Sequence, residues 1–228
     1  MNGPMNEMAR FRRALVAGAA GGAAAATTAT ATAVATAHDL AAAVGLRTVV
    51  LVEGGSDQVA VEALAARRGR DLDAEGVAVV PLGGVTNIGK FLALCGPSGL
   101  DVRLAGLCDA GEERFFQRGL ERVGLGTDLT RAALEPLGFY VCVADLEDEL
   151  IRALGADAVR EVVDAQGESR PFRTFQNQPA QRRRTVEQQL RRFMGTHSGR
   201  KSLYAQALIE HLPPPRTPRP LDRLLAHI

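Results

Sequence analysis

Four short apolar runs alternate with helical segments between residues 47 and 155, and this alternation limits the possible fold more than any other feature of the sequence. The first run, Thr48 to Glu53, is apolar at every inner position, which is typical of a strand buried on both faces. The other three runs cover residues 77–82, 102–108 and 139–143. Strands that alternate with helices predict an α/β fold with a parallel sheet and helices on both of its faces.

Helical periodicity fills the segments between and after these runs. The expected helices cover residues 57–68, 87–94, 112–122, 146–154, 157–165, 185–194, 201–211 and 221–226. No strand signal follows residue 155, so a helical C-terminal extension is expected. An Ala/Thr-rich leader comes first, with short helices expected near residues 8–17 and 38–44. The sequence thus predicts three parts: a partly helical or disordered leader at 1–46, an α/β domain at 47–155, and a helical, Arg-rich extension at 156–228.

Composition bears on location more than on fold. The three cysteines, Cys95, Cys108 and Cys142, stand alone inside apolar runs without CxxC spacing, which indicates buried thiols in a reducing compartment. The Ala, Gly and Thr residues of the leader would gain little from a bilayer, and no other stretch approaches the ~18 apolar residues of a membrane-spanning helix. We therefore expect a cytoplasmic protein with no membrane association.

Carboxylate side chains stand where these runs end. Glu53 and Asp57 flank the turn after the first run, Asp109 follows the third, and Glu147 comes shortly after the fourth. The carboxyl ends of parallel strands meet at one edge of a sheet, so we expect these side chains to share one crevice. Carboxylates gathered that closely repel each other, and a hard divalent cation, Mg²⁺ or Mn²⁺, is the usual relief. The structural alternative is that Asp57 caps one helix and Glu147 opens the acidic first turn of another.

Positive charge is concentrated between residues 170 and 201, although the whole chain of 228 residues has a formal net charge of only +1. The only acid in this segment is Glu187. Six arginines are the expected contacts to nucleic-acid phosphates: Arg182, Arg183, Arg184, Arg191, Arg192 and Arg200. The alternative interpretation of the same segment is a solvated helix face.

The residues at the strand ends resemble a known family. The resemblance depends on Val52-Glu53-Gly-Gly-Ser-Asp57, Gly83-Gly84, Asp109 and Asp145-Leu-Glu147-Asp-Glu-Leu, each after its strand. Together these elements resemble a TOPRIM domain, in particular that of the overcoming-lysogenization-defect (OLD) family nucleases. The resemblance covers residues 47–155 and extends to Lys201. It implies a small parallel sheet of about four strands that binds Mg²⁺ for phosphodiester chemistry on DNA.

The resemblance also implies a role for each matching residue. Glu53 and Asp109 resemble the ligands of one metal ion, and Asp57 and Glu147 resemble the ligands of a second. Lys201 stands where the nucleases place a lysine that stabilises charge during the reaction. Glu53 and Lys201 are therefore the expected catalytic residues.

The chain departs from the family pattern at the third strand. The family usually has Asp-x-Asp there, whereas this sequence has Asp109-Ala110-Gly111, so the second carboxylate is absent. Glu112 or Glu113 could replace it, and Glu112 is included among the expected metal ligands. The expected function is a Mg²⁺-dependent nuclease or related phosphotransfer enzyme acting on DNA. The alternative is a non-catalytic nucleic-acid-binding or regulatory TOPRIM protein with a degenerate metal site.

A second departure concerns the region before the domain. The nucleases usually carry an ATPase domain ahead of the TOPRIM domain, where this chain has its Ala/Thr-rich leader. The resemblance therefore implies two expected partners, DNA and a separate ATPase subunit. It leaves the oligomeric state open.

Overall fold

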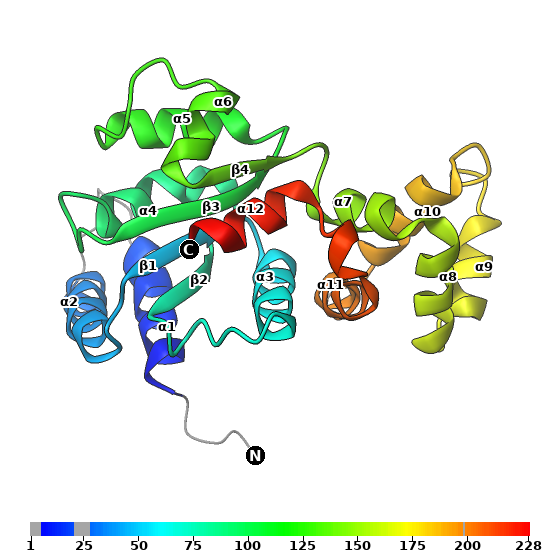
Figure 1. Cartoon of the computed structure of the whole chain (residues 1–228), viewed down its shortest axis with the longest axis horizontal. Coiled ribbons are helices and arrows are strands. Elements are labelled where there is room, and N and C mark those ends of the chain that lie inside the picture. Colours follow the sequence, from blue (N-terminus) through cyan, green and yellow to red (C-terminus); the bar gives the residue numbers. More distant parts are fainter. Residues whose placement is uncertain (1–5, 21–27, 198) are drawn as a thin grey trace.

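A four-stranded parallel sheet lies at the centre of the protein (Figure 1), in the strand order β2-β1-β3-β4. The structure is a computed structural model that describes residues 6–20, 28–197 and 199–228. Its strands are β1 (Thr48–Val52), β2 (Val77–Pro81), β3 (Arg103–Asp109) and β4 (Phe139–Cys142). The expected α/β class, with about four parallel strands and helices on both faces, is confirmed.

The inner strand β1 explains why its sequence is apolar at every position. It lies between β2 and β3, and all five of its side chains are buried. Val50 and Val52 belong to the core on one face of the sheet, and Val49 and Leu51 to the core on the other. Leu51 pairs with Gly106 of β3 in the parallel register. A strand covered on both faces has no solvent side on which a polar residue could alternate.

The first face of the sheet is continuous with the C-terminal helices. One apolar cluster contains side chains of β1 and β2 together with helices from both the middle and the end of the chain. These helices are α3 (Gly55–Arg67), α7 (Leu146–Leu154), α8 (Ala156–Ala165), α9 (Ser169–Gln176), α10 (Val186–Met194), α11 (Arg200–His211) and α12 (Arg219–His227). The helical extension therefore packs through the same core as the sheet. Helices α8, α9 and α10 sit beyond α7 in Figure 1, whereas α12 returns to the sheet beside β3 and β4.

The second face is covered by the N-terminal helices and by the helices that cross between strands. They are α1 (Glu7–Ala20), α2 (Thr28–Ala43), α4 (Ile88–Cys95), α5 (Glu113–Arg122) and α6 (Arg131–Leu134). Three 3₁₀ turns complete the described elements: η1 (Val85–Asn87), η2 (Glu135–Leu137) and η3 (Pro214–Arg216). Helix α1 buries Met8, Phe11 and Leu15 in the apolar cluster of this face.

The sequence prediction falls short at the leader and at two other helices. Both leader helices are longer than expected and α1 packs onto the sheet, while residues 21–27 lie outside the described part. Helices α6 and α9 were not expected. In α9 Pro171 lies in the first turn, where the missing backbone N–H is no loss, although the same residue interrupts a sequence-based helix signal. The division into three domains stays a prediction.

The remaining expected strands and helices are found with both ends within two residues of the prediction. None of the helices in the described ranges is long and apolar enough to cross a membrane.

Gly106 provides a test of how tightly the sheet is packed. A methyl group at this position would lie 2.7 Å from Phe139 Cδ1 and 2.8 Å from the backbone oxygen of Leu51. We therefore expect Gly106→Ala to lower the free energy of unfolding by about 1–3 kcal/mol, measured by urea denaturation.

The matched control is Gly89→Ala. Gly89 lies in α4, and apart from its chain neighbours and the backbone of its own helix, no atom lies within 4 Å of the position that its methyl group would take. This variant should be unchanged or more stable by up to about 1 kcal/mol, because alanine has the lower entropy cost in a helix. Equal losses in the two variants would contradict the tight packing at Gly106.

Candidate metal centre

The four strands end at the edge of the sheet that faces α7 (Figure 1), and Glu53 follows β1 at this edge. The Glu53 carboxylate accepts a hydrogen bond of 2.6 Å from the backbone N–H of Asp109, the last residue of β3. Parallel pairing of β1 with β3 therefore brings together two expected ligands that are 56 residues apart in the sequence.

Glu112 turns toward the same point. Its backbone N–H donates to the Asp109 carbonyl over 2.9 Å, and its carboxyl group lies close enough to that of Glu53 to affect its ionisation. Burial first, and hydrogen bonding with Glu112 second, raise the pKa of Glu53 to about 9, against the opposing effect of the Asp109 N–H.

Glu113 is excluded from this group by its own contacts. Its carboxylate forms an ion pair with Arg131 and accepts a hydrogen bond of 3.0 Å from Gln117. Of the two residues that could replace the missing carboxylate at Gly111, the structure therefore brings Glu112 to Glu53 and leaves Glu113 on the side of α6.

Asp57 lies in the first turn of α3 and has two roles in the structure. Its carboxylate accepts a hydrogen bond of 2.8 Å from the backbone N–H of Gly54, so the helix-start interpretation holds. Burial first, and then the charges of Glu147 and Asp145, raise the pKa of Asp57 to about 6, against the opposing effects of the Gly54 N–H and Lys201. Asp57 is therefore both a helix-start residue and a member of the acidic group.

Lys201 reaches this group from the far end of the sequence. It lies in the first turn of α11, which packs against α3, and its Nζ is 3.2 Å from the buried carboxylate of Glu147. Burial disfavours the charge on Lys201, but the Glu147 carboxylate outweighs burial, so the pKa of this lysine is raised. The structure thus places Lys201 beside Asp57 and Glu147, as the resemblance implies.

Asp109 connects the two parts of the cluster. Burial raises its pKa to about 7, and the charges of Asp145, Asp57 and Glu147 act in the same direction. Sequence reasoning did not include Asp145 among the site residues. Asp145 could have been found from its position immediately before α7. There it caps the helix by accepting a hydrogen bond of 2.8 Å from the Asp148 N–H.

The donor set fits a hard divalent cation in chemistry. All the carboxylate oxygens are ligands of the kind that Mg²⁺ and Mn²⁺ prefer, and Oε2 of Glu112 is buried without a hydrogen-bond partner. The side chains meet in pairs, Glu53 with Glu112 and Glu147 with Lys201. No group of three or more His, Cys, Asp or Glu side chains in the described ranges is already placed to hold a metal ion.

The arginine-rich segment divides into two groups. Arg182, Arg183, Arg184 and Arg192 are exposed, and the first and third donate only to backbone carbonyls, of Asn177 and Ala180. Arg191 and Arg200 differ from the sequence expectation because each is held by an acid outside the segment. Arg191 pairs with Asp145 at 2.6 Å, and Arg200 pairs with Glu168 at the same distance.

Arg200 is the more enclosed of these two arginines. Its guanidinium carbon lies 4.3 Å from the centre of the Phe193 ring, and its side chain is only 11% exposed. Glu168 also accepts a hydrogen bond of 2.8 Å from the hydroxyl of Tyr204. Arg200 and Glu168 therefore join α9, α10 and α11, a structural role that the sequence did not indicate.

Comparison with known proteins agrees with the family resemblance of the sequence. A family model described as "Overcoming lysogenization defect protein-like, TOPRIM domain" matches residues 46–110. No curated protein matches the chain significantly. Among solved structures, the C-terminal region of the Xanthomonas campestris pv. campestris OLD protein is 27% identical with a TM-score of 0.64, over 81% of this chain and 92% of that one.

A second solved structure, the C-terminal region of the Burkholderia pseudomallei OLD protein, shares the fold. It is 22% identical with a TM-score of 0.63, over 80% of this chain and 96% of that one. Residues 46–110 therefore resemble the TOPRIM domain of OLD proteins, as the strand-end motifs predict. TOPRIM domains generally bind divalent metal ions such as Mg²⁺.

The buried charge of Glu53 should reduce stability in a chelating buffer. We expect Glu53→Gln to raise the free energy of unfolding, because glutamine keeps both hydrogen bonds without needing a proton. Each kcal/mol gained should raise the melting temperature by about 2–4 °C. Since the pKa of Glu53 is raised from 4.5 to about 9, its contribution to stability is complete below pH 4.5 and is lost as the pH rises toward 9. The gap between variant and wild type should therefore widen from about pH 5 to about pH 8 in thermal melts.

The control is the same substitution at Glu149. This carboxylate is also buried, but it accepts the Val143 N–H over 2.7 Å and pairs with Arg152 at 2.8 Å. Glu149→Gln should lower the melting temperature, because it removes the partner of a cation. A lower melting temperature for Glu53→Gln than for the wild type at pH 8 would contradict the claim that the buried Glu53 charge reduces stability.

Proposed function

We propose that this protein is a metal-dependent nuclease that acts on DNA through the carboxylates at the end of its sheet. The observation that carries this proposal is the meeting of Glu53, Asp109 and Glu112 at the end of β3, through hydrogen bonds of 2.6 Å from the Asp109 N–H to Glu53 and 2.9 Å from the Glu112 N–H to the Asp109 carbonyl. Glu112 thereby supplies a carboxylate near Gly111, where the family pattern has lost its second one. The expected cofactor is Mg²⁺ or Mn²⁺.

The proposal assigns a role to each acidic residue. Glu53, Asp109 and Glu112 would hold one metal ion, and Asp57 and Glu147 would hold a second. When bound, such ions activate a water molecule and stabilise the leaving oxygen of a phosphodiester. The Asp109 N–H keeps the Glu53 carboxylate oriented toward this position, with a hydrogen bond of 2.6 Å.

Lys201 is the cation that the chain itself contributes. Its side chain is about half exposed while its partner Glu147 is buried, so the ammonium group lies at the rim of the site and can reach a phosphate from solvent. A positive charge there would offset the negative charge that develops on phosphate oxygens during cleavage. This placement supports Lys201 as a catalytic residue alongside Glu53.

The exposed arginines support a nucleic-acid substrate. Arg182, Arg183, Arg184 and Arg192 have no ion-pair partner in the described ranges, so their charges are available to phosphates. Arg191 and Arg200 are set aside as direct contacts, because Asp145 and Glu168 already hold them.

A second candidate function is favoured by Gly111. Its position leaves the third strand without the family's second carboxylate, so a non-catalytic DNA-binding or regulatory protein would show the same basic residues and a weak metal site. The two candidates differ in whether Glu112 acts as a ligand, which mutation can test.

Two further proposals depend on less direct support. The three cysteines are buried and free, which fits a reducing compartment, and we propose a cytoplasmic location. A separate ATPase subunit remains a proposal based on the resemblance to OLD nucleases.

The adjacent pair Glu112 and Glu113 offers a matched comparison of activity. With Mg²⁺ or Mn²⁺ and plasmid DNA, we expect Glu112→Gln and Glu53→Ala to reduce cleavage at least tenfold, because the loss of a ligand lowers metal affinity by about 10–100-fold or more. Glu113→Gln should stay within about twofold of the wild type, because Glu113 is turned toward Arg131. DNA binding should persist in all three variants.

The outcome of this comparison separates the two candidate functions. An inactive wild type that gains metal binding on Gly111→Asp would support the regulatory protein. An active wild type that is indifferent to changes at Glu53 and Glu112 would contradict the assignment of the chemistry to this edge.

The arginine-rich segment should bind phosphates and not a base sequence. We expect the double variant Arg183→Glu, Arg184→Glu to weaken binding to all DNA sequences alike and to make the salt dependence shallower, by about 0.9 in logarithmic slope for each lost phosphate contact. Arg10→Glu with Arg13→Glu, on α1, is the control with the same change of charge. Equal losses in the two double variants, measured by fluorescence anisotropy, would count against a specific basic surface.

A further inference from the structure

Phe115 is unlike every other aromatic side chain of the protein. The chain has eight phenylalanines, two tyrosines and no tryptophan, and all lie within the described ranges. Nine of these side chains are buried, whereas Phe115 is 45% exposed. In a protein with so few aromatic residues, an exposed ring on the first turn of α5 has no role in the core.

The same helix presents three arginines to solvent. Arg114, Arg118 and Arg122 are four residues apart, so they lie along one side of α5 over about 12 Å. All three are exposed, and none has an ion-pair or hydrogen-bond partner for its side chain in the described part of the chain. The two acids of α5 are engaged elsewhere, Glu113 with Arg131 and Glu121 with the backbone N–H of Leu129.

This surface begins at the candidate metal centre. The backbone N–H of Phe115 donates to the carbonyl of Glu112 over 2.9 Å, so the exposed ring is within one helical turn of the carboxyl group that contacts Glu53. The three arginines continue from there toward the end of α5. We define Arg114, Phe115, Arg118 and Arg122 as the α5 surface.

The α5 surface is separate from the arginine-rich segment. Helix α5 packs on the second face of the sheet through Phe116 and Leu120, whereas α9 and α10 belong to the core of the first face. The carboxylates lie at the edge between the two faces. A strand that crosses this edge would therefore meet arginines on both sides of the site.

We propose that the α5 surface binds the nucleic-acid strand on one side of the reacting phosphate. In this proposal, which rests on the proposed function, Phe115 stacks on a base next to the metal centre, and the three arginines contact successive phosphates. Unpaired arginines complement a phosphate backbone, and an exposed aromatic ring supplies the stacking surface for a base that is not paired. The site would therefore prefer single-stranded DNA or a locally unpaired end.

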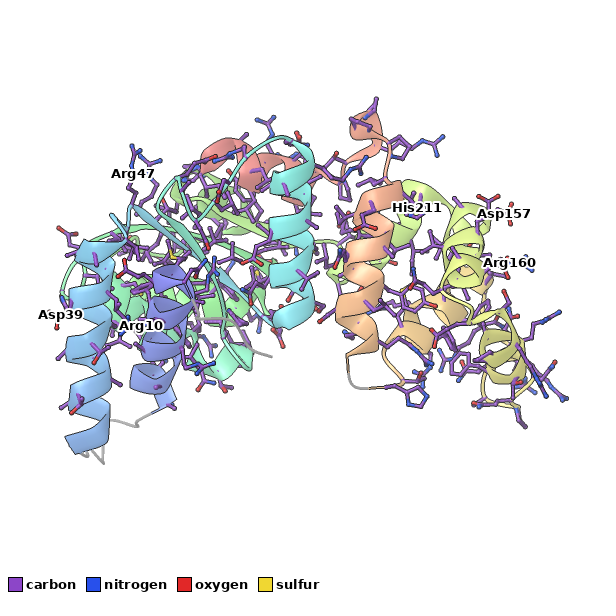
Figure 2. The ribbon with its side chains drawn as sticks, turned by 90° about the horizontal axis from the view of Figure 1, so that it is seen from below. Arg10, Asp39, Arg47, Asp157, Arg160 and His211 are labelled. Atoms are coloured by element: carbon purple, nitrogen blue, oxygen red, sulfur yellow. The ribbon has the colours of Figure 1, made fainter. Side chains whose placement is uncertain are left out.

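The first test removes the charge of the α5 surface. The triple variant Arg114→Gln, Arg118→Gln, Arg122→Gln should bind single-stranded DNA at least tenfold more weakly at about 0.1 M salt. Its logarithmic salt slope should be shallower by about 2.1, which is 0.7 for each of three phosphates of a single strand. The control is Arg10→Gln, Arg13→Gln, Arg47→Gln, which removes the same charge from exposed positions. Figure 2 shows Arg10 and Arg47 at the opposite end of the molecule from Arg160 of α8.

The second test uses the absence of tryptophan from the chain. Phe115→Trp creates the only tryptophan of the chain, which can be excited selectively, and stacking on a base should quench its emission when single-stranded DNA is added. Val16→Trp, at an exposed position of α1, should show no quenching at the same DNA concentrations. Phe115→Ala should in turn lower the affinity for single-stranded DNA about tenfold and that for fully paired DNA less.

The outcomes distinguish this proposal from the proposed function. If wild type binds and cleaves DNA while the α5 triple variant matches its control and the emission of Phe115→Trp is not quenched, the α5 surface is not a nucleic-acid site and the inference is wrong. If wild type neither binds nor cleaves DNA in any metal, the proposed function itself fails. Equal loss of affinity for single-stranded and duplex DNA in Phe115→Ala would contradict base stacking.

Discussion

The parallel pairing of β1 with β3 is the constraint on which the candidate site depends. It places the carboxylate that follows one strand within 2.6 Å of the last backbone N–H of the other, so Glu53 and Asp109 meet although they lie far apart in the sequence. Because β1 is buried on both faces, Glu53 emerges at the end of an apolar strand and is itself half-buried. The same pairing that completes the core therefore takes a carboxylate out of water.

Three acidic side chains at this edge have a partner that moderates the resulting cost. Glu53 accepts the Asp109 N–H, Asp57 accepts the Gly54 N–H, and Glu147 pairs with Lys201. The pKa values of Glu53, Asp57 and Asp109 are nevertheless all raised, because burial and the neighbouring carboxyl groups outweigh these contacts. A group of carboxylates held in this way is common where function requires it and rare where only stability is selected.

The sequence predicts the fold and the positions of the strand-end carboxylates better than it predicts the partners of charged residues. The apolar runs specify buried strands, and strand ends in a parallel sheet must converge, so the positions of Glu53, Asp109 and Glu147 follow from local patterns. The choice between Glu112 and Glu113 does not, because it depends on where α5 begins relative to Arg131. The sequence pattern predicts that Arg191 and Arg200 are unpaired, because their acidic partners, Asp145 and Glu168, come from other parts of the chain.

The central claim is that Glu53 and Glu112 together bind a divalent metal ion, and anomalous diffraction from crystals grown with Mn²⁺ tests it most directly. The account predicts an anomalous peak at the end of β1 and β3, with both carboxyl groups as ligands. Mn²⁺ bound at another position, with neither the Glu53 nor the Glu112 carboxyl group as a ligand, would contradict the account.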